Sequence, residues 1–309
     1  MVRSPSMAWL ERIGANHRVT LPARCLVGRG PECLLKTQDR RVSGEHARIA
    51  WTGERWELRD LGSRNGTFVN ESRLEAGVST PLAVGDALGF GGPEPVWRFA
   101  DAGAPLAFAR ALEGGHNRAA EDGLLVLPDA DNPRVCVFED FQQGWVVEAE
   151  DATRSVSDCE VLTVEGQAWM LHLPMTLEAT AEVGEDTPVF AGVELVFEVS
   201  RDEEDIGMQV LHRGRELVRG ARNHHQLLLL LARARLEDAA DGSAPPAEQG
   251  WRYVEDVCAA LQIEDLRLNT EIYRARKELA PHVQGGAGLV ERRRASRSLR
   301  LGTGRVRLV

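Results

Sequence analysis

The chain has 309 residues, of which 43% are hydrophobic and 27% are charged, as is usual for a globular protein of about two or three domains. No apolar run approaches the ~20 residues of a membrane-spanning helix, and the first residues lack a signal-peptide core, so we expect a cytoplasmic protein. The five cysteines are scattered and form no CxxC pair, which favours reduced thiols over disulfides or a zinc site.

Charge is unevenly distributed along the chain. The net charge of −10 argues by itself against nucleic-acid binding. Residues 267–309, however, contain 11 Arg or Lys and 3 Glu, so this segment carries +8 and the remainder −18. Such asymmetry indicates a basic patch on a C-terminal domain, with an ordinary solvated basic surface as the alternative.

The first two thirds of the chain are predicted to be β-structure. Residues 1–103 contain short strand-like runs separated by polar and glycine-containing turns, which predicts a β-sandwich. Asn65-Gly66 lies between two such runs and predicts a β-hairpin turn. Residues 104–200 begin with an Ala- and Gly-rich segment and then return to strands. We expect a β-rich middle region there, which would be a spacer, a degenerate second sandwich or a dimer surface.

Four short motifs follow one another in the first region. They are Gly28-Arg29, Ser43-x-x-His46, the run Ser63-Arg64-Asn65-Gly66-Thr67, and Gly85-Asp86 followed by Phe90-Gly91. In this order and spacing they resemble the forkhead-associated (FHA) domain over residues 25–99. The resemblance implies a domain that binds phosphothreonine in a partner, which would be a kinase, its substrate or a second copy of this chain.

The resemblance also implies roles for individual residues. Arg29, Ser43, Arg64 and Asn65 would contact the phosphopeptide, while Gly28, His46, Gly66 and Thr67 would shape the site. The residue types suit the task, because a phosphate of about −1.5 to −2 charge is best met by guanidinium, hydroxyl and amide donors. Glu71 stands where the family often has glycine, which leaves the peptide selectivity open.

Residues 201–309 change to a mixed pattern of a hairpin around Arg213-Gly214, three helical segments and a final pair of strands. In the third helix, Leu268, Ile272, Ala275 and Leu279 share one stripe, which predicts a helix packed on a core. The residues expected to face solvent are polar or cationic: Arg267, Thr270, Tyr273, Arg274 and Lys277. Such a face suits a DNA groove, although it is also compatible with an ordinary amphipathic helix.

This order of elements resembles the winged-helix output domain of bacterial response regulators of the OmpR class. The resemblance implies that the third helix enters the major groove and that a hairpin wing contacts the DNA backbone. The wing cations would be Arg292, Arg293, Arg294 and Arg297. Arginines on a hairpin are suited to phosphate contact.

Adjacent histidines precede the first helix. On a helix, His224 and His225 would point about 100° apart, so we interpret them as capping or packing residues rather than metal ligands. Asn223 is a candidate N-cap for this helix.

The sequence therefore predicts a multi-domain protein of β plus α+β class, with an FHA sandwich at 1–103, a β-rich region at 104–200 and a winged helix at 201–309. The predicted function is a phosphorylation-responsive bacterial transcription regulator that binds double-stranded DNA. The alternative is a phosphopeptide-binding adaptor whose winged helix contacts protein. The sequence lacks a phosphate-binding GxxxxGK[ST] loop, HExxH and GxSxG, so we expect no enzyme activity, cofactor or metal, and homodimerisation stays open.

Overall fold

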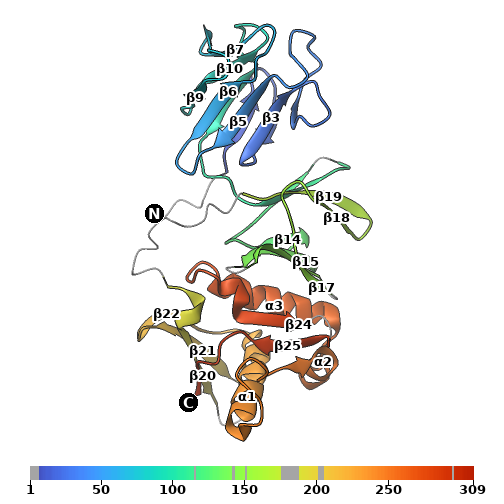
Figure 1. The fold of residues 1–309 in the computed structure, drawn as a ribbon. Helices are drawn as coiled ribbons and strands as arrows, with labels where there is room; N and C mark the ends of the chain where they lie inside the picture. Colours follow the sequence, from blue (N-terminus) through green and yellow to red (C-terminus); the bar gives the residue numbers. More distant parts are fainter. Residues whose placement is uncertain are drawn as a thin grey trace. The chain divides into compact units, whose positions relative to one another are not determined.

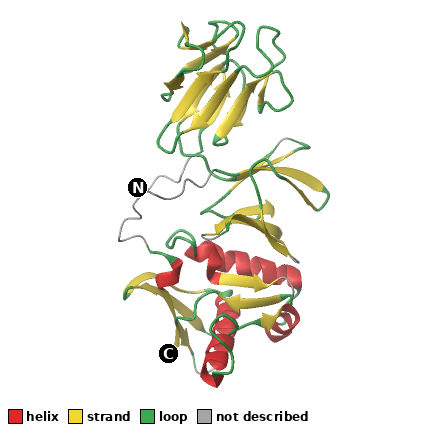
Figure 2. Cartoon of the chain, viewed as in Figure 1, coloured by secondary structure: helices red, strands yellow, loops and turns green. Residues whose placement is uncertain are grey.

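The computed structural model describes residues 7–114, 116–140, 143–149, 152–174, 188–200, 205–293 and 296–309. The chain divides into two compact units, residues 1–108 with 172–177, and residues 109–171 with 178–309. Strands occur in every part of the described chain, and the α-helices lie between residues 225 and 279 (Figure 2). Within the described residues, no helix combines the length and apolar character needed to cross a bilayer.

The first unit is a β-sandwich, as predicted (Figure 1). One sheet has the order β2-β1-β11-β10-β7-β8 and the other the order β4-β3-β5-β6-β9. The strands are β1 (Trp9–Arg12), β2 (Arg18–Thr20), β3 (Arg24–Gly28), β4 (Leu35–Lys36), β5 (Ala47–Trp51), β6 (Trp56–Asp60), β7 (Thr67–Val69), β8 (Ser72–Arg73), β9 (Ser79–Pro81), β10 (Ala87–Phe90) and β11 (Trp97–Asp101). Alternate residues of β6, beginning with Trp56 and Leu58, are buried in the core, which follows from the period of two in a strand.

The prediction of a β-hairpin turn at Asn65-Gly66 is wrong. Strand β6 belongs to one sheet and β7 to the other, so residues 61–66 cross between the two sheets instead of reversing a hairpin. The hairpin in this region joins β7 and β8, and its turn residues Asn70 and Glu71 have φ of 50° and 65°. The Asn70 side chain donates to Asp86 and accepts from the Ala87 amide, which holds this turn against β10.

The middle of the chain forms two four-stranded sheets, with the orders β13-β12-β19-β18 and β14-β15-β16-β17. We call the second the middle sheet. The strands are β12 (Phe108–Ala111), β13 (Asn117–Ala119), β14 (Leu125–Pro128), β15 (Pro133–Asp140), β16 (Gly144–Ala149), β17 (Ala152–Ser155), β18 (Val161–Val164) and β19 (Gln167–His172). This part is β-rich, as the strand-like runs in the sequence predict.

The C-terminal domain starts earlier than residue 201. Strand β20 (Val193–Val199) pairs antiparallel with β21 (Ile206–His212) and parallel with β26 (Val306–Leu308), in a sheet of order β22-β21-β20-β26. Its central residues Leu195 and Phe197 are fully buried in the same core as the helices. The β21–β22 (Arg215–Ala221) hairpin turns at Arg213 and Gly214, both with positive φ, as predicted.

Three helices and a small sheet complete this domain. They are α1 (His225–Asp241), α2 (Val254–Leu261) and α3 (Asp265–Leu279), with β23 (Arg252–Tyr253), β24 (Val290–Arg293) and β25 (Ser298–Leu301) in the order β23-β25-β24. Short 3₁₀ turns lie at Phe190–Gly192 and Gly286–Leu289. The N-cap of α1 is His224, not Asn223, and no side chain caps the helix there.

The apolar stripe predicted for α3 is confirmed. Leu268, Ile272, Ala275 and Leu279 are at most 2% exposed and pack in one core with α1, α2 and the strands. In α1 the leucine run is buried on most of its circumference, because both the sheet and the other helices cover it.

The assignment of β20 to the C-terminal domain can be tested by Leu195→Ala. We expect this variant to lose about 2–5 kcal/mol of unfolding free energy, since it leaves a cavity in the core of the domain. Urea denaturation followed by far-UV circular dichroism, which reports mainly on the three helices of this domain, measures the loss. Leu308→Ala, at a position that is 39% exposed, is the matched control and should change little. A loss in the Leu195 variant as small as in the control would contradict the assignment.

Candidate functional site

The four residues predicted to contact a phosphopeptide lie on loops at one end of the sandwich. These loops follow β3, precede β5 and follow β6, and antiparallel pairing of these strands brings them together. The Arg29 amide donates to the Ser43 carbonyl (3.0 Å), and the Arg64 amide donates to the Ser43 hydroxyl (3.3 Å). Asn65 Nδ2 donates to the Arg41 carbonyl at 2.7 Å. The structure therefore joins all four residues in one loop cluster.

His46 connects two of these loops through hydrogen bonds of its side chain. It is fully buried, its Nδ1 accepts from the Ser43 amide (3.0 Å), and its Nε2 donates to the Gly66 carbonyl (3.1 Å). This pattern requires the neutral ring with the proton on Nε2. Burial lowers the pKa of His46, which keeps the ring neutral.

Asp60 organises the loop that carries Arg64 and Asn65. Its carboxylate accepts from the amides of Gly62 and Ser63 and from the hydroxyls of Ser63 and Thr67. Burial by itself would raise the pKa of Asp60, but these hydrogen bonds outweigh it and lower the pKa. Asp60 was not predicted from the sequence, although an aspartate two residues before a glycine, as in Asp60-Leu61-Gly62, is typical of a turn in which the carboxylate accepts from the glycine amide.

Two glycines in the site leave no room for a side chain. A Cβ on Gly28 would lie 2.1 Å from the Gly44 carbonyl oxygen. Gly66 has φ of 89°, and a Cβ there would lie 2.5 Å from Arg73 Nε. Both positions therefore require glycine for the loops to approach as they do.

Two exposed cations of this loop cluster have no carboxylate partner among the ion pairs of the described residues. Arg29 donates through Nε to the Val42 carbonyl at 2.6 Å, which orients its guanidinium, and Arg64 projects from the neighbouring loop. Arg41, by contrast, is paired with Asp39 and Glu94. The cluster thus combines two uncompensated positive charges with a hydroxyl and an amide, which suits an anion.

The predicted DNA-reading face of α3 is not exposed as expected. Thr270 and Tyr273 are each only 6% exposed. Tyr273 packs with Phe138 and Val146 of the middle sheet, and the Thr270 hydroxyl donates back to the Leu266 carbonyl. The prediction of a solvent-facing surface is therefore wrong at these two positions, and at Tyr273 the reason is that an apolar sheet from earlier in the chain covers the side chain.

The cations predicted to contact DNA form ion pairs within the second unit. Arg267 and Arg274 both pair with Glu271, and Lys277 pairs with Glu121 at 2.6 Å. In the strand pair β24–β25, the pairs are Arg292–Glu148, Arg293–Glu248, Arg297–Asp265 and Arg297–Glu255. Arg294 lies outside the described residues.

Glu148 on β16 lies at the centre of a buried charge cluster. Both of its oxygens accept from Arg276 of α3 at 2.9 Å, and Arg292 Nε lies 3.0 Å from Oε1. Arg276 is 2% exposed, also donates to the Val290 carbonyl, and stacks over the Phe138 ring. Burial would raise the pKa of Glu148, but the two arginines lower it. Neither Glu148 nor Arg276 was predicted to have a role, although a glutamate within an otherwise apolar strand indicates a buried charge that needs a partner.

His224 and His225 converge, contrary to the expectation that adjacent residues diverge. Their Nε2 atoms lie 2.6 and 2.8 Å from Glu278 Oε2, so both rings turn toward this one carboxylate. His225 Nδ1 accepts from the Arg222 amide, so its Nε2 carries the proton and donates to Glu278. Burial by itself would raise the pKa of Glu278, but the hydrogen bonds with the two histidines lower it to about 2. The two rings thus tie the start of α1 to the end of α3.

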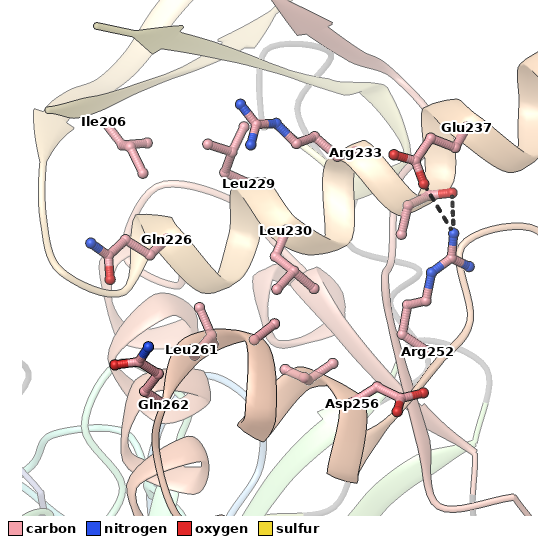
Figure 3. Close-up of a pocket in the computed structure, with 13 residues that line it drawn as sticks. Ile206, Gln226, Leu229, Leu230, Arg233, Glu237, Arg252, Asp256, Leu261 and Gln262 are labelled. Carbon is pink, nitrogen blue, oxygen red and sulfur yellow. Dashed lines mark hydrogen bonds and ion pairs between the residues drawn. The ribbon is translucent and has the colours of Figure 1, made fainter. Parts of the chain in front are cut away.

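A pocket lies between α1 and α2 (Figure 3). Leucines form its floor, and Gln226, Gln262 and Asp256 lie at its rim. At one end Arg252 pairs with Glu237 at 3.4 Å. None of the predicted site residues lines this pocket.

Comparisons with known proteins identify the first unit. Residues 25–91 match the model of the FHA domain. The chain is 35% identical over 69 residues to the FHA domain-containing protein FhaB of Mycolicibacterium smegmatis, and 36% identical over 76 residues to protein phosphatase 2C 70 of Arabidopsis thaliana. These matches cover 22% and 24% of this chain, and 44% and 13% of the relatives, so the chain spans less than half the length of either.

Two solved structures are also similar to part of this chain. One from a study of phosphothreonine-dependent FHA domain interactions is 30% identical, covers 31% of this chain and 99% of that chain, and has a TM-score of 0.27. Mycobacterium tuberculosis EmbR in complex with a low-affinity phosphopeptide is 26% identical, covers 31% of this chain and 25% of that chain, and has a TM-score of 0.28.

The buried neutral His46 predicts a specific pH dependence of stability. Its folded pKa lies below the ordinary value of 6.5, so its contribution is complete above about pH 6.5 and is lost as pH falls below that value. We expect the unfolding free energy of the parent to decline there, well above the range where carboxylates titrate. Urea denaturation at several pH values, followed by tryptophan fluorescence, measures this. His46→Asn should flatten the decline, and the exposed His17→Asn should not. An equal decline in all three would contradict the prediction.

Proposed function

We propose that this chain, whose residues 25–91 form an FHA domain, is a phosphothreonine-binding signalling protein with a C-terminal DNA-binding domain, and that it regulates transcription. FHA domains bind phosphothreonine-containing peptides. The observation that carries the proposal here is that the two cations among the predicted site residues, Arg29 and Arg64, are exposed and have no carboxylate partner among the ion pairs of the described residues, on loops joined through Ser43.

The chemistry of this loop cluster fits a phosphate monoester. Its charge of about −1.5 to −2 would be met by the two guanidinium groups. The Ser43 hydroxyl accepts from the Arg64 amide, so its own proton is available for a phosphate oxygen. Asn65 uses one N–H on the Arg41 carbonyl, and its remaining N–H and its oxygen can pair with a peptide backbone. The proposed role is recognition, not catalysis.

The DNA-binding part of the proposal is supported by the order of elements. A four-stranded sheet, α1, α2, α3 and the β24–β25 pair follow one another as in winged-helix domains. In that arrangement α3 would lie in the major groove. It would use Arg267, Arg274 and Lys277, and β24–β25 would place its arginines on the phosphates.

A second candidate is a phosphopeptide-binding adaptor whose C-terminal domain contacts protein. The burial of Thr270 and Tyr273 favours it, as do the internal ion pairs of the α3 cations. It differs from the first candidate in having no salt-dependent affinity for DNA.

Arg29→Ala tests the phosphothreonine site. Loss of a charge-assisted hydrogen bond is worth about 1.5–3 kcal/mol, so the affinity should fall by roughly 10- to 100-fold. Fluorescence anisotropy with a peptide selected from a library with fixed phosphothreonine measures the affinity, beside its phosphoserine and unmodified forms. Arg55→Ala, which removes an exposed arginine paired with Glu57 on the same domain, is the matched control. Equal binding by the Arg29 variant and the parent would refute the assignment.

Arg274→Ala tests DNA contact by α3. We expect the full chain to shift genomic DNA fragments at low salt, and the variant to bind a few-fold more weakly with a salt slope reduced by about one. Arg219→Ala, an exposed arginine on β22 with its own glutamate partners, should bind like the parent. Absence of DNA binding by the parent and by the Glu148 variant described below would favour the adaptor.

A further inference from the structure

We propose that the middle sheet acts as an autoinhibitory cover on α3, so that DNA and the middle sheet compete for the same face of this helix. The inference rests on the proposed DNA-binding function and adds its regulation. It is drawn from contacts within the second compact unit, residues 109–171 with 178–309.

The charged residues at this contact are the reason why the middle sheet and DNA phosphates would compete for the same cations. Glu148 holds Arg276 with two parallel hydrogen bonds and also pairs with Arg292, much as a phosphate group would. Glu121 holds Lys277 at 2.6 Å. Residues from before the C-terminal domain therefore supply the negative charges that the DNA backbone would supply in a complex.

The apolar part of the contact covers one edge of the predicted reading face, at Tyr273. Tyr273 lies in a small cluster with Leu124, Val126, Phe138 and Val146. An aromatic side chain at this place on α3 cannot reach a base while the sheet covers it. The middle sheet thus hinders DNA in two ways. It covers the Tyr273 side chain, and its Glu148 neutralises Arg276 and Arg292.

The contact can open without unfolding of the C-terminal domain. The main core of that domain contains buried residues from Val193 to Leu301 and none from residues 109–171. The cluster beneath the middle sheet is separate and much smaller. Opening would also return Arg276 and Glu148 to water, which recovers their desolvation penalty and makes the closed state reversible.

Native cysteines report opening directly. Cys136 on β15 is partly exposed and lines the same contact as Glu148, Tyr273 and Arg276, where burial raises the pKa of its thiol to about 12. Cys159 is exposed, whereas Cys25 and Cys258 are buried in the main cores of the two units. Thiol labelling followed by peptide mass spectrometry therefore separates opening, which makes Cys136 more accessible while Cys25 and Cys258 stay covered, from unfolding, which exposes Cys25 or Cys258.

The experiment compares the parent with Glu148→Gln in the full chain. Removing the charge that holds Arg276 should raise the labelling rate of Cys136 by at least about tenfold and strengthen DNA binding about tenfold or more, with Cys25 and Cys258 unchanged. Glu165→Gln, which breaks an exposed pair with Arg134, should leave both unchanged. If Glu148→Gln exposes Cys258, Glu121→Arg, which repels Lys277 at an exposed position, provides the same test.

Three results would overturn the inference, and they can be told apart. If Cys136 of the parent labels as fast as Cys159, the cover is not formed. If the variant opens and DNA binding stays at the parent's level, the contact does not inhibit, although DNA binding itself stands. If the opened variant and the parent both bind no DNA, the proposed DNA-binding function itself fails, and regulation of it fails as well.

Discussion

The carboxylate of Glu148 is the constraint on which the second unit depends. It is 6% exposed, and it accepts from Arg276 of α3 and pairs with Arg292 of β24. A buried arginine without such a counter-charge would cost several kcal/mol, so the closed arrangement of α3, β24 and the middle sheet depends on this carboxylate. The surrounding apolar residues then pack Tyr273 and Phe138 against each other.

The two candidate binding surfaces differ in how their cations are used. On the FHA domain, Arg29 and Arg64 keep their charge available, while the buried His46 and Asp60 hold the loops in place. On α3, Arg274 and Lys277 are already satisfied by Glu271 and Glu121. This contrast explains how a chain with net charge −10 can carry a basic C-terminal segment that is largely neutralised within the fold.

Much of the fold could be predicted because its signals are local. The four motifs of the first domain indicated a sandwich, and the spacing of Leu268, Ile272, Ala275 and Leu279 gave the buried side of α3. The errors share one physical cause, which is that sequence patterns do not show distant partners. Asn65-Gly66 is a good turn signal, but which sheet receives β7 is decided by long-range pairing. The covered face of α3 depends on residues more than a hundred positions earlier, and the convergence of His224 and His225 depends on Glu278.

Zero-length carbodiimide cross-linking shows whether the middle sheet covers α3 in the resting chain. The chain has only two lysines, Lys36 and Lys277, so few amine–carboxylate products compete. If the sheet covers α3, Lys277 and Glu121, which lie 2.6 Å apart, should cross-link in the parent, and the yield should fall when DNA is added. A parent chain in which Lys277 gives no cross-link to Glu121, at a concentration where the protein is folded, would contradict it.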